Sequence, residues 1–294
     1  MTFEPLDACF GARVLGVKVA ELDDEEFAEL YQQWLHYGLL VFEGQHLTRD
    51  EQQAFANRFG DLEIPMAELS NVKPDGSLRV DDGNDDMMKV HKGNMGWHHD
   101  STYMPVQAKG AVFCAEVVPA EGGATGFADM AAAYDELDDE RKARLESLRA
   151  HHSLYHSQGK VGHHSDAVED ATVTSGSEES SYGGYGFHDG PVSIRPLVKT
   201  HPETGRKNLL VGRHAYDVIG LSPEESESLL AEVNDWAVSN PARVYHHQWE
   251  PGDAVLWDNR RLMHQATPWP FDQARIMWHS RIAGAAESEG ALAE

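Results

Sequence analysis

The sequence predicts a mainly β fold, a sandwich or barrel with helical decoration. Many short segments are rich in valine, leucine, isoleucine and aromatic residues, and turn residues separate them. Only a few segments carry apolar residues at helical spacing, which favours a sandwich or barrel over a parallel sheet. The 294 residues show no internal repeat and are compatible with a single domain that carries a long insertion.

The composition excludes several classes of protein. Hydrophobic residues make up 41% and charged residues 25%, so the chain can bury a core. The 49 acidic residues outnumber the 24 basic ones, and the formal charge of -25 would repel nucleic acid rather than bind it. The acidic excess leaves two sources open, a salt-adapted one and an ordinary cytoplasm.

Cysteine usage and hydropathy indicate the compartment. Cys9 and Cys114 are too few for a disulfide framework or a thiolate metal site, which fits a reducing environment. The N-terminus lacks a basic segment followed by an apolar one, and no run approaches the ~18 apolar residues of a membrane span. We therefore expect a cytoplasmic protein with no membrane partner.

The N-terminal elements follow from local signals. Residues 11–19 are rich in valine and suit a strand, and acidic residues from Asp23 then open an amphipathic helix that stops at Gly38. Residues 39–42, LLVF, predict a strand. Thr48 caps a second helix.

The middle of the chain combines loops with one clear strand. Residues 74–96 are polar, acidic and rich in glycine, which predicts a loop. Residues 111–118 read as a buried strand, and 119–126, PAEGGATG, as a turn. An amphipathic helix is expected from 128 to 148.

Residues 151–190 show no sustained period and predict a flexible insertion. Loops of that length are often lids, although disorder explains the pattern equally well. Later elements are strands at 194–202, 208–214, 254–259 and 274–284, a helix at 222–238 and a disordered acidic tail at about 285–294.

A His-x-Asp pattern stands at His98 and Asp100. Residues two apart on an extended segment point to the same side, so both side chains can meet one ion while His99 points away. The chain contains 17 histidines, and a polar turn explains the tripeptide equally well when it is taken alone.

A second, distant histidine would complete a metal-ligand set of two imidazoles and one carboxylate. That set leaves adjacent positions open on Fe(II) for a bidentate cosubstrate and oxygen. The candidates in the C-terminal part of the chain are His246, His247, His264 and His279, and His264 follows the apolar segment AVLWDNRRLM.

Several motifs together resemble one family. The segments WHHDSTYMP, EGGATGFADMAAAYDEL, GDAVLWDNRRLMHQATPW and ARIMWHSRIAG occur in the order typical of TauD/TfdA 2-oxoglutarate-dependent dioxygenases. SNVKPDGSLR, DDMMKVHKGNM, THPETGRKNLLVGRHA and MWHSR resemble the branch of (S)-2-phenoxypropionate dioxygenases, which act on aryloxyalkanoates such as dichlorprop and mecoprop. The resemblance implies a double-stranded β-helix core, also called a jelly-roll or cupin-like core.

The resemblance also implies a set of site residues. His98, Asp100 and His264 would be the ligands of Fe(II), with 2-oxoglutarate and O2 as cosubstrates. Arg275 would form a salt bridge to the distal carboxylate of 2-oxoglutarate, Thr125 would hydrogen-bond to it, and Trp257 would pack against it.

The substrate end departs from the taurine branch. That branch has an arginine four residues beyond the cosubstrate arginine, where this chain has His279, with Arg281 two residues further on. The substrate acid group therefore needs another cation, for which we consider Lys73 and Arg213 first and Arg281 third. Asn94 and Tyr103 flank the His-x-Asp motif and are expected to line the same pocket, as is His279.

The implied reaction hydroxylates an acidic small molecule. An (S)-2-aryloxypropionate would lose its ether bond to give a phenol and a 2-oxo acid, with succinate and CO2 as coproducts. Asp100 favours hydroxylation, because a halogenating relative would lack that carboxylate. Alternatives are the same chemistry on a sulfonate such as taurine, on an alkyl sulfate or on a natural carboxylic acid, a zinc hydrolase, and a binding protein without activity. Family members commonly form homo-oligomers.

Overall fold

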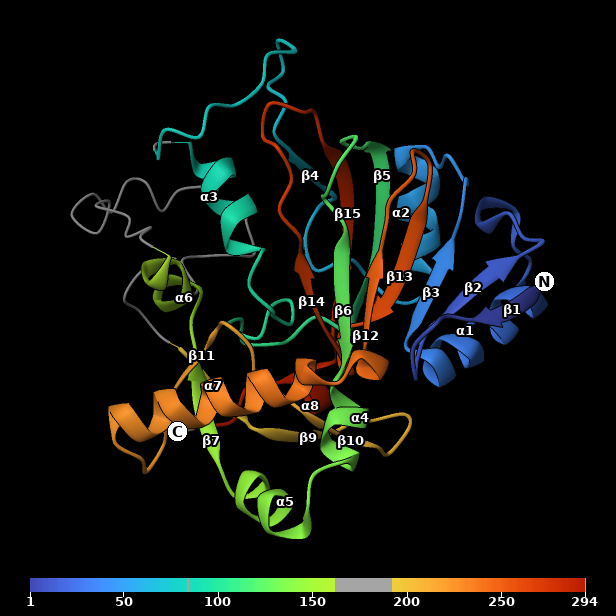
Figure 1. Cartoon of the computed structure of the whole chain (residues 1–294). Coiled ribbons are helices and arrows are strands. Elements are labelled where there is room, and N and C mark those ends of the chain that lie inside the picture. Colours follow the sequence, from blue (N-terminus) through green and yellow to red (C-terminus); the bar gives the residue numbers. More distant parts are fainter. Residues whose placement is uncertain (84, 162–191, 294) are drawn as a thin grey trace.

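The computed structural model describes residues 1–83, 85–161 and 192–293 (Figure 1). Its largest sheet has seven strands in the order β1-β2-β3-β13-β5-β15-β4. A three-stranded sheet of order β12-β6-β14 lies against it. The strands of the large sheet are β1 (Thr2–Pro5), β2 (Ala12–Leu15), β3 (Leu39–Phe42), β4 (Ala67–Ser70), β5 (Gly110–Val117), β13 (Ala254–Asp258) and β15 (Ile276–Ile282). Those of the smaller sheet are β6 (Thr125–Asp129), β12 (Val244–His247) and β14 (Leu262–Ala266).

Strand β13 shows how the large sheet joins two cores. Ala254 and Leu256 pack with the helices on the outer face, whereas Val255 and Trp257 pack with the smaller sheet on the inner face. Successive side chains of a strand point to opposite faces, so a central strand covered on both sides must be apolar throughout. All five residues of β13 are buried, including Asp258 at its end.

Two helices that the sequence predicts cover the outer face of the large sheet in the structure (Figure 1). Asp23 and Thr48 each form a capping box with a glutamate three residues later, at the starts of α1 (Asp24–Tyr37) and α2 (Arg49–Asn57). Gly38 ends α1 at φ 77°, in the left-handed region where glycine carries no steric cost.

A third core lies beside the sandwich. Helix α7 (Pro223–Ser239) packs there with α4 (Met130–Asp135) and α5 (Asp139–Glu146). The neighbouring strands are β7 (Arg149–His152), β8 (Ser193–Pro196), β9 (Val198–Thr200), β10 (Lys207–Leu209) and β11 (Ala215–Val218), which form a sheet of order β11-β7-β8 and a β9-β10 pair. Helices and strands are thus mixed, and among the described residues no sheet closes into a barrel.

Three predictions for the middle of the chain are corrected. The loop expected at 74–96 contains α3 (Asp86–Gly93), because Asp85 caps its N-terminus through the Met88 amide. The turn expected at 119–126 ends in β6, which begins at Thr125. The helix expected over 128–148 is two helices, since Asp138 caps a second N-terminus.

The predicted disordered tail is wrong for the residues that the structure describes. Residues 286–289 form α8 (Ala286–Glu289), and the Glu289 side chain is 1% exposed and paired with Lys199. The Ala291 amide donates to Pro105 O over 2.7 Å, and that of Leu292 to Ile194 O over 2.9 Å. The segment therefore packs onto the body of the protein.

The predicted insertion at 151–190 is only partly described. Its first residues complete β7 and form α6 (Leu154–Lys160), whereas residues 162–191 lie outside the described part of the chain. Among the helices that the structure describes, none has the length and apolar character needed to cross a membrane.

Candidate active site

A backbone bridge brings the first motif to a strand far away in sequence. The His98 amide donates to His264 O over 2.9 Å, and the His264 amide donates to His98 O over 2.8 Å. Directly opposed residues of an antiparallel pair project to the same side. The two imidazole centroids are consequently 4.3 Å apart.

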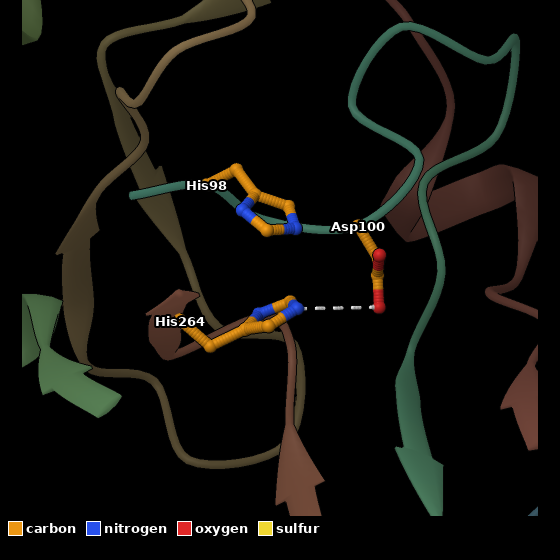
Figure 2. A group of neighbouring side chains, drawn as sticks. All are labelled: His98, Asp100 and His264. Atoms are coloured by element: carbon orange, nitrogen blue, oxygen red, sulfur yellow. Dashed lines mark ion pairs between the residues drawn. The ribbon is translucent and has the colours of Figure 1, made fainter. Parts of the chain in front are cut away.

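Asp100 completes the group. One ligand atom from each of His98, Asp100 and His264 lies within 4.8 Å of the others, and among the described residues this is the one such group of three. The residues are 5%, 6% and 8% exposed. Figure 2 shows the Asp100 carboxylate beside the two rings, with its Oδ2 atom 3.7 Å from His264 Nε2.

The hydrogen bonds leave metal-binding atoms available. His98 Nδ1 lies 2.7 Å from Gly96 O, and a carbonyl only accepts, so this nitrogen carries the hydrogen and Nε2 keeps its lone pair. Among the residues that the structure describes, none donates a hydrogen bond to the buried Asp100 Oδ2 atom. A buried carboxylate oxygen without a donor is costly, and a cation would satisfy it. The donor set fits a divalent iron ion.

Electrostatics favours the ligand forms of all three side chains. Burial lowers the pKa of His98 well below its usual range and that of His264 to about 4, so both imidazoles are neutral near pH 7. Burial acts to raise the pKa of Asp100, but Arg281 and the neighbouring imidazoles outweigh it and hold that pKa low. The carboxylate is therefore ionised.

Asn259 holds the backbone of Asp100 and was not selected from the sequence. Its Oδ1 accepts from the Asp100 amide over 2.7 Å, and its Nδ2 donates to Asp100 O over 3.0 Å and to Ala108 O over 2.8 Å. The one available signal was a polar residue at the end of a strongly apolar strand, in the sequence AVLWDN.

The group opens onto a cavity of about 310 Å³ between the two sheets. Its lining includes every predicted metal and cosubstrate residue, namely His98, Asp100, His264, Thr125, Trp257 and Arg275. The substrate candidates among the lining residues are Asn94, Tyr103, His279 and Arg281. Lys73 and Arg213 do not line it, although the Arg213 guanidinium donates to Gln158, which does.

Arg275 and Thr125 present hydrogen-bond donors to this cavity. Arg275 is 3% exposed, and its Nε and Nη2 atoms have no hydrogen-bond acceptor in the described part of the chain. Burial lowers its pKa to about 10, which leaves the guanidinium charged at neutral pH. Trp249 Nε1 donates to Thr125 Oγ1 over 3.0 Å, so the threonine hydroxyl keeps its own hydrogen for another acceptor.

Aromatic rings form the inner wall. The His279 ring lies nearly parallel to that of Trp257, with centroids 5.5 Å apart and planes 14° apart. Its Nε2 atom is 3.4 Å from Asp100 Oδ2. His279 thus lies beside the Asp100 carboxylate as well as against Trp257.

Apolar side chains form another part of the wall. They come from the segment before β4, from β4 itself, from α3, from β5 and from α6, and they are Ile64, Ala67, Leu69, Val90, Phe113 and Leu154. Such a wall favours a substrate with an apolar body.

Three curated proteins similar to this chain are described as dioxygenases of aryloxy acids. The chain is 64% identical to an (S)-phenoxypropionate/alpha-ketoglutarate-dioxygenase of Sphingobium herbicidovorans, covering 98% of this chain and 97% of the relative. A protein of the same description from Delftia acidovorans is 52% identical over 98% and 96%. An alpha-ketoglutarate-dependent 2,4-dichlorophenoxyacetate dioxygenase of Cupriavidus pinatubonensis is 34% identical over 92% and 93%.

Solved structures agree with the sequence comparisons. The crystal structure of AAD-2 in complex with Mn(II) and N-oxalylglycine superposes with a TM-score of 0.87 at 33% identity, covering 100% of this chain and 99% of that one. The family model for taurine catabolism dioxygenase TauD, TfdA family, matches residues 2–282. A match of that extent, with full-length relatives, establishes that the chain belongs to the TauD/TfdA family.

Proposed function

We propose that the substrate of this 2-oxoglutarate-dependent dioxygenase is an aryloxyalkanoate, specifically an (S)-2-aryloxypropionate or a close relative. Hydroxylation of the carbon next to the ether oxygen would give a product that collapses to a phenol and a 2-oxo acid. The observation that carries the proposal is the group of His98, Asp100 and His264 at the wall of a largely apolar cavity. The relatives that act on (S)-phenoxypropionate support this substrate class.

His98, Asp100 and His264 would hold Fe(II). Iron bound there supplies the activation of O2, while 2-oxoglutarate is converted to succinate and CO2. The chain contributes two neutral imidazoles, one ionised carboxylate and a buried setting, which together suit a ferrous ion with positions left open.

Arg275 and Thr125 would hold the distal carboxylate of 2-oxoglutarate. A guanidinium fork matches a carboxylate with parallel charge-assisted bonds, and Arg275 has two donor atoms without an acceptor among the residues that the structure describes. The Thr125 hydroxyl adds one donor. Trp257 would form the wall against which the cosubstrate rests.

Arg213 is our first candidate for binding the substrate acid group. Among the described residues it has no carboxylate partner, and it borders the cavity through Gln158, its acceptor over 3.1 Å. Lys73, in the loop after β4, is the second candidate. Asn94 and Tyr103 would line the path between the acid group and the metal site, and Ile64, Leu69 and Val90 would contact the aryl ring.

We also propose that the two facing sheets are the halves of a double-stranded β-helix. The fold of the structural relatives supports this description of the core. His264, the third of the five residues of β14, lines the cavity between the two sheets, as a ligand residue on the interior of such a core would.

One oxygen-pulse experiment tests the function. The protein is loaded anaerobically with Fe(II) and 2-oxoglutarate, given one candidate substrate and then exposed to oxygen, and succinate and phenol are both measured. The panel contains (S)- and (R)-2-aryloxypropionates, aryloxyacetates, taurine and an alkyl sulfate. We expect phenol and succinate in equal amounts from an (S)-2-aryloxypropionate.

Other outcomes would redirect the assignment. Faster succinate release with taurine or the alkyl sulfate would move the substrate to the sulfonate and sulfate class. Turnover that needs neither oxygen nor 2-oxoglutarate would exclude the proposed chemistry. The His264→Ala variant is the matched control and should form neither product.

A further inference from the structure

We infer that Arg281 is a positioning residue, which fixes the carboxylate of Asp100 so that one of its oxygens faces His264. The inference rests on the proposed function, because it concerns the carboxylate proposed as a metal ligand. It assigns Arg281 a role different from binding the substrate acid group, for which Arg281 was the third candidate from the sequence, after Lys73 and Arg213.

The two oxygens of Asp100 have different surroundings. Oδ1 lies 3.3 Å from Arg281 Nη2, whereas Oδ2 lies 3.7 Å from His264 Nε2 and 3.4 Å from His279 Nε2. Figure 2 shows the second of these oxygens directed at the His264 ring. A guanidinium on one oxygen restrains rotation of the carboxylate and leaves the other oxygen for an ion.

Arg281 is itself held by two further residues. Its Nη1 atom donates to Ser101 Oγ over 3.0 Å, and Ser101 Oγ donates to Glu63 Oε2 over 2.7 Å. Glu63 Oε2 lies 3.7 Å from Arg281 Nη1, and the Glu63 amide donates to Arg281 O over 2.9 Å. The guanidinium is thus fixed to the loop that carries Asp100 and to the segment before β4.

The backbone conformation of Ser101 shows why its contacts with Arg281 and Glu63 matter for Asp100. Ser101 follows Asp100 and adopts φ 58°, in the left-handed region that a serine seldom occupies. The residue is 0% exposed. Its hydroxyl links the turn to both Arg281 and Glu63, so the same contacts hold the turn and orient the carboxylate.

Charge distinguishes Arg281 from a substrate anchor. Its side chain is 11% exposed and already lies within 4.0 Å of two carboxylates, those of Asp100 and Glu63. A third carboxylate would gain little from a cation that two acids already share. Arg213, by contrast, has no acid partner among the described residues, and Arg275 has donor atoms without acceptors.

Metal binding in the absence of turnover tests the inference. Mn(II) is titrated by calorimetry into wild-type protein, Arg281→Met, Arg281→Lys and Ser101→Ala, with circular dichroism to check folding. We expect Arg281→Met to bind Mn(II) about 10- to 100-fold more weakly. Arg281→Lys should fall between wild type and Arg281→Met, because one ammonium group keeps the charge but loses the fork.

Kinetic constants supply the second readout. For Arg281→Lys we expect a lower kcat with a nearly unchanged KM for the aryloxypropionate. Arg213→Met is the matched control and should show the reverse, a higher KM for that substrate with wild-type Mn(II) affinity. Ser101→Ala keeps the Cβ atom and removes only the hydroxyl, so it should weaken Mn(II) binding by a smaller factor.

The outcomes separate this inference from the proposed function. If wild-type protein binds no Mn(II), or if His264→Ala binds it equally well, the proposed function fails. If wild type binds Mn(II) through His264 but the Arg281 variants bind it equally tightly and raise the substrate KM, Arg281 is the substrate anchor and the inference is wrong. Should Arg281→Met fail to fold, Arg281→Lys and Ser101→Ala decide, and wild-type affinity in both overturns it.

Discussion

Asn259 positions the candidate metal ligand Asp100 through hydrogen bonds to the Asp100 backbone rather than to the Asp100 side chain. Its amide bonds to both the N–H and the carbonyl of Asp100, and it is 0% exposed. A residue that supports a ligand through the backbone stands at no fixed sequence distance from the His-x-Asp motif, so a sequence pattern does not reveal it. The energetic consequence is nevertheless testable, because each of these bonds satisfies a buried backbone group.

We expect Asn259→Ala to lower the free energy of unfolding measured in urea. Each buried backbone group left without a partner costs about 1–3 kcal/mol, and three such groups lose their partner here. Mn(II) affinity should fall as well, since the Asp100 backbone becomes mobile. Asn57→Ala, an exposed change at the end of α2, is the control. Equal stability of the two variants would contradict the structural role of Asn259.

Gly93 supplies a second prediction for a single residue. A Cβ atom at Gly93 would lie 2.6 Å from Arg213 Nη1 and 2.8 Å from Gln158 Oε1. Gly93→Ala should therefore displace the guanidinium and raise KM for the aryloxypropionate, by roughly tenfold if about 1.4 kcal/mol of binding is lost.

Cosubstrate kinetics provide the check on that prediction. KM for 2-oxoglutarate should stay near its wild-type value in Gly93→Ala, because the atoms nearest the added Cβ belong to Arg213 and Gln158 rather than to Arg275 or Thr125. Lys89→Ala, in the same helix, controls for a general effect on α3. If Gly93→Ala left both KM values unchanged, Arg213 would no longer be the first candidate for the substrate acid group.

Sequence reasoning located the candidate ligands unevenly. The His-x-Asp spacing made His98 and Asp100 candidates, although a polar turn explained the spacing equally well, and His264 was one of several distant histidines. The family resemblance selected all three residues. What joins them is a backbone bridge across more than a hundred residues, and local periodicity contains no information about such a pairing. The contact of Arg281 with Asp100 is also purely tertiary, so the sequence offered Arg281 only as a third candidate for the substrate acid group.

Among the secondary-structure elements, those with strong local signals were predictable. The sequence predicted α1 and α7 with boundaries within one residue of the structure, and Thr48 predicted the start of α2. Sequence patterns did not predict strand β6, because the strand begins inside a glycine-rich turn. Its pairing with β12 and β14 stabilises the strand, whereas its own composition does not predict one.

The C-terminal segment shows tertiary contacts overriding composition. Its acidic, alanine-rich sequence predicts disorder. In the structure, however, the backbone N–H of Gln107 donates to Glu289 O, and Arg195 Nη1 donates to the same carbonyl. Arg195 also bonds to Thr102 O and Met104 O, in the loop that follows Asp100. Helix α8 is therefore linked to the loop that carries the candidate ligand.

Glu289→Gln should destabilise the protein through Lys199. Burial lowers the pKa of Lys199 while Glu289 raises it, so the pair keeps the ammonium charged inside the protein. Breaking a buried pair from one side costs about 3 kcal/mol, because the remaining charge is left without compensation. Urea unfolding of Glu289→Gln should show that loss.

A second substitution tests whether the charge is responsible. Adding Lys199→Met to Glu289→Gln should recover much of the lost stability, since no buried charge then remains. Hydrogen exchange in residues 101–107 should rise in Glu289→Gln and return toward wild type in the double variant. If the double variant were less stable than Glu289→Gln, the pair would matter for packing rather than for charge.

At the scale of the whole molecule, the acidic excess is the feature that the fold does not explain. With 49 acidic and 24 basic residues, most acidic side chains have no basic partner available to them, and the formal charge is -25. Self-repulsion of that size disfavours the compact state, whereas exposed ion pairs contribute only about 0–1 kcal/mol each. Repulsion should therefore dominate the response to salt.

We expect the free energy of unfolding to rise with ionic strength. The screening length falls from ~10 Å at 0.1 M salt to ~3 Å at 1 M, so repulsion between distant carboxylates is largely removed. A gain of about 1 kcal/mol would raise Tm by ~2 °C for a chain of this size. Sodium chloride and potassium chloride should act alike if screening is the cause. A Tm that stayed constant or fell between 0.1 M and 1 M would mean that attractive ion pairs, rather than net charge, set the electrostatic stability of this fold.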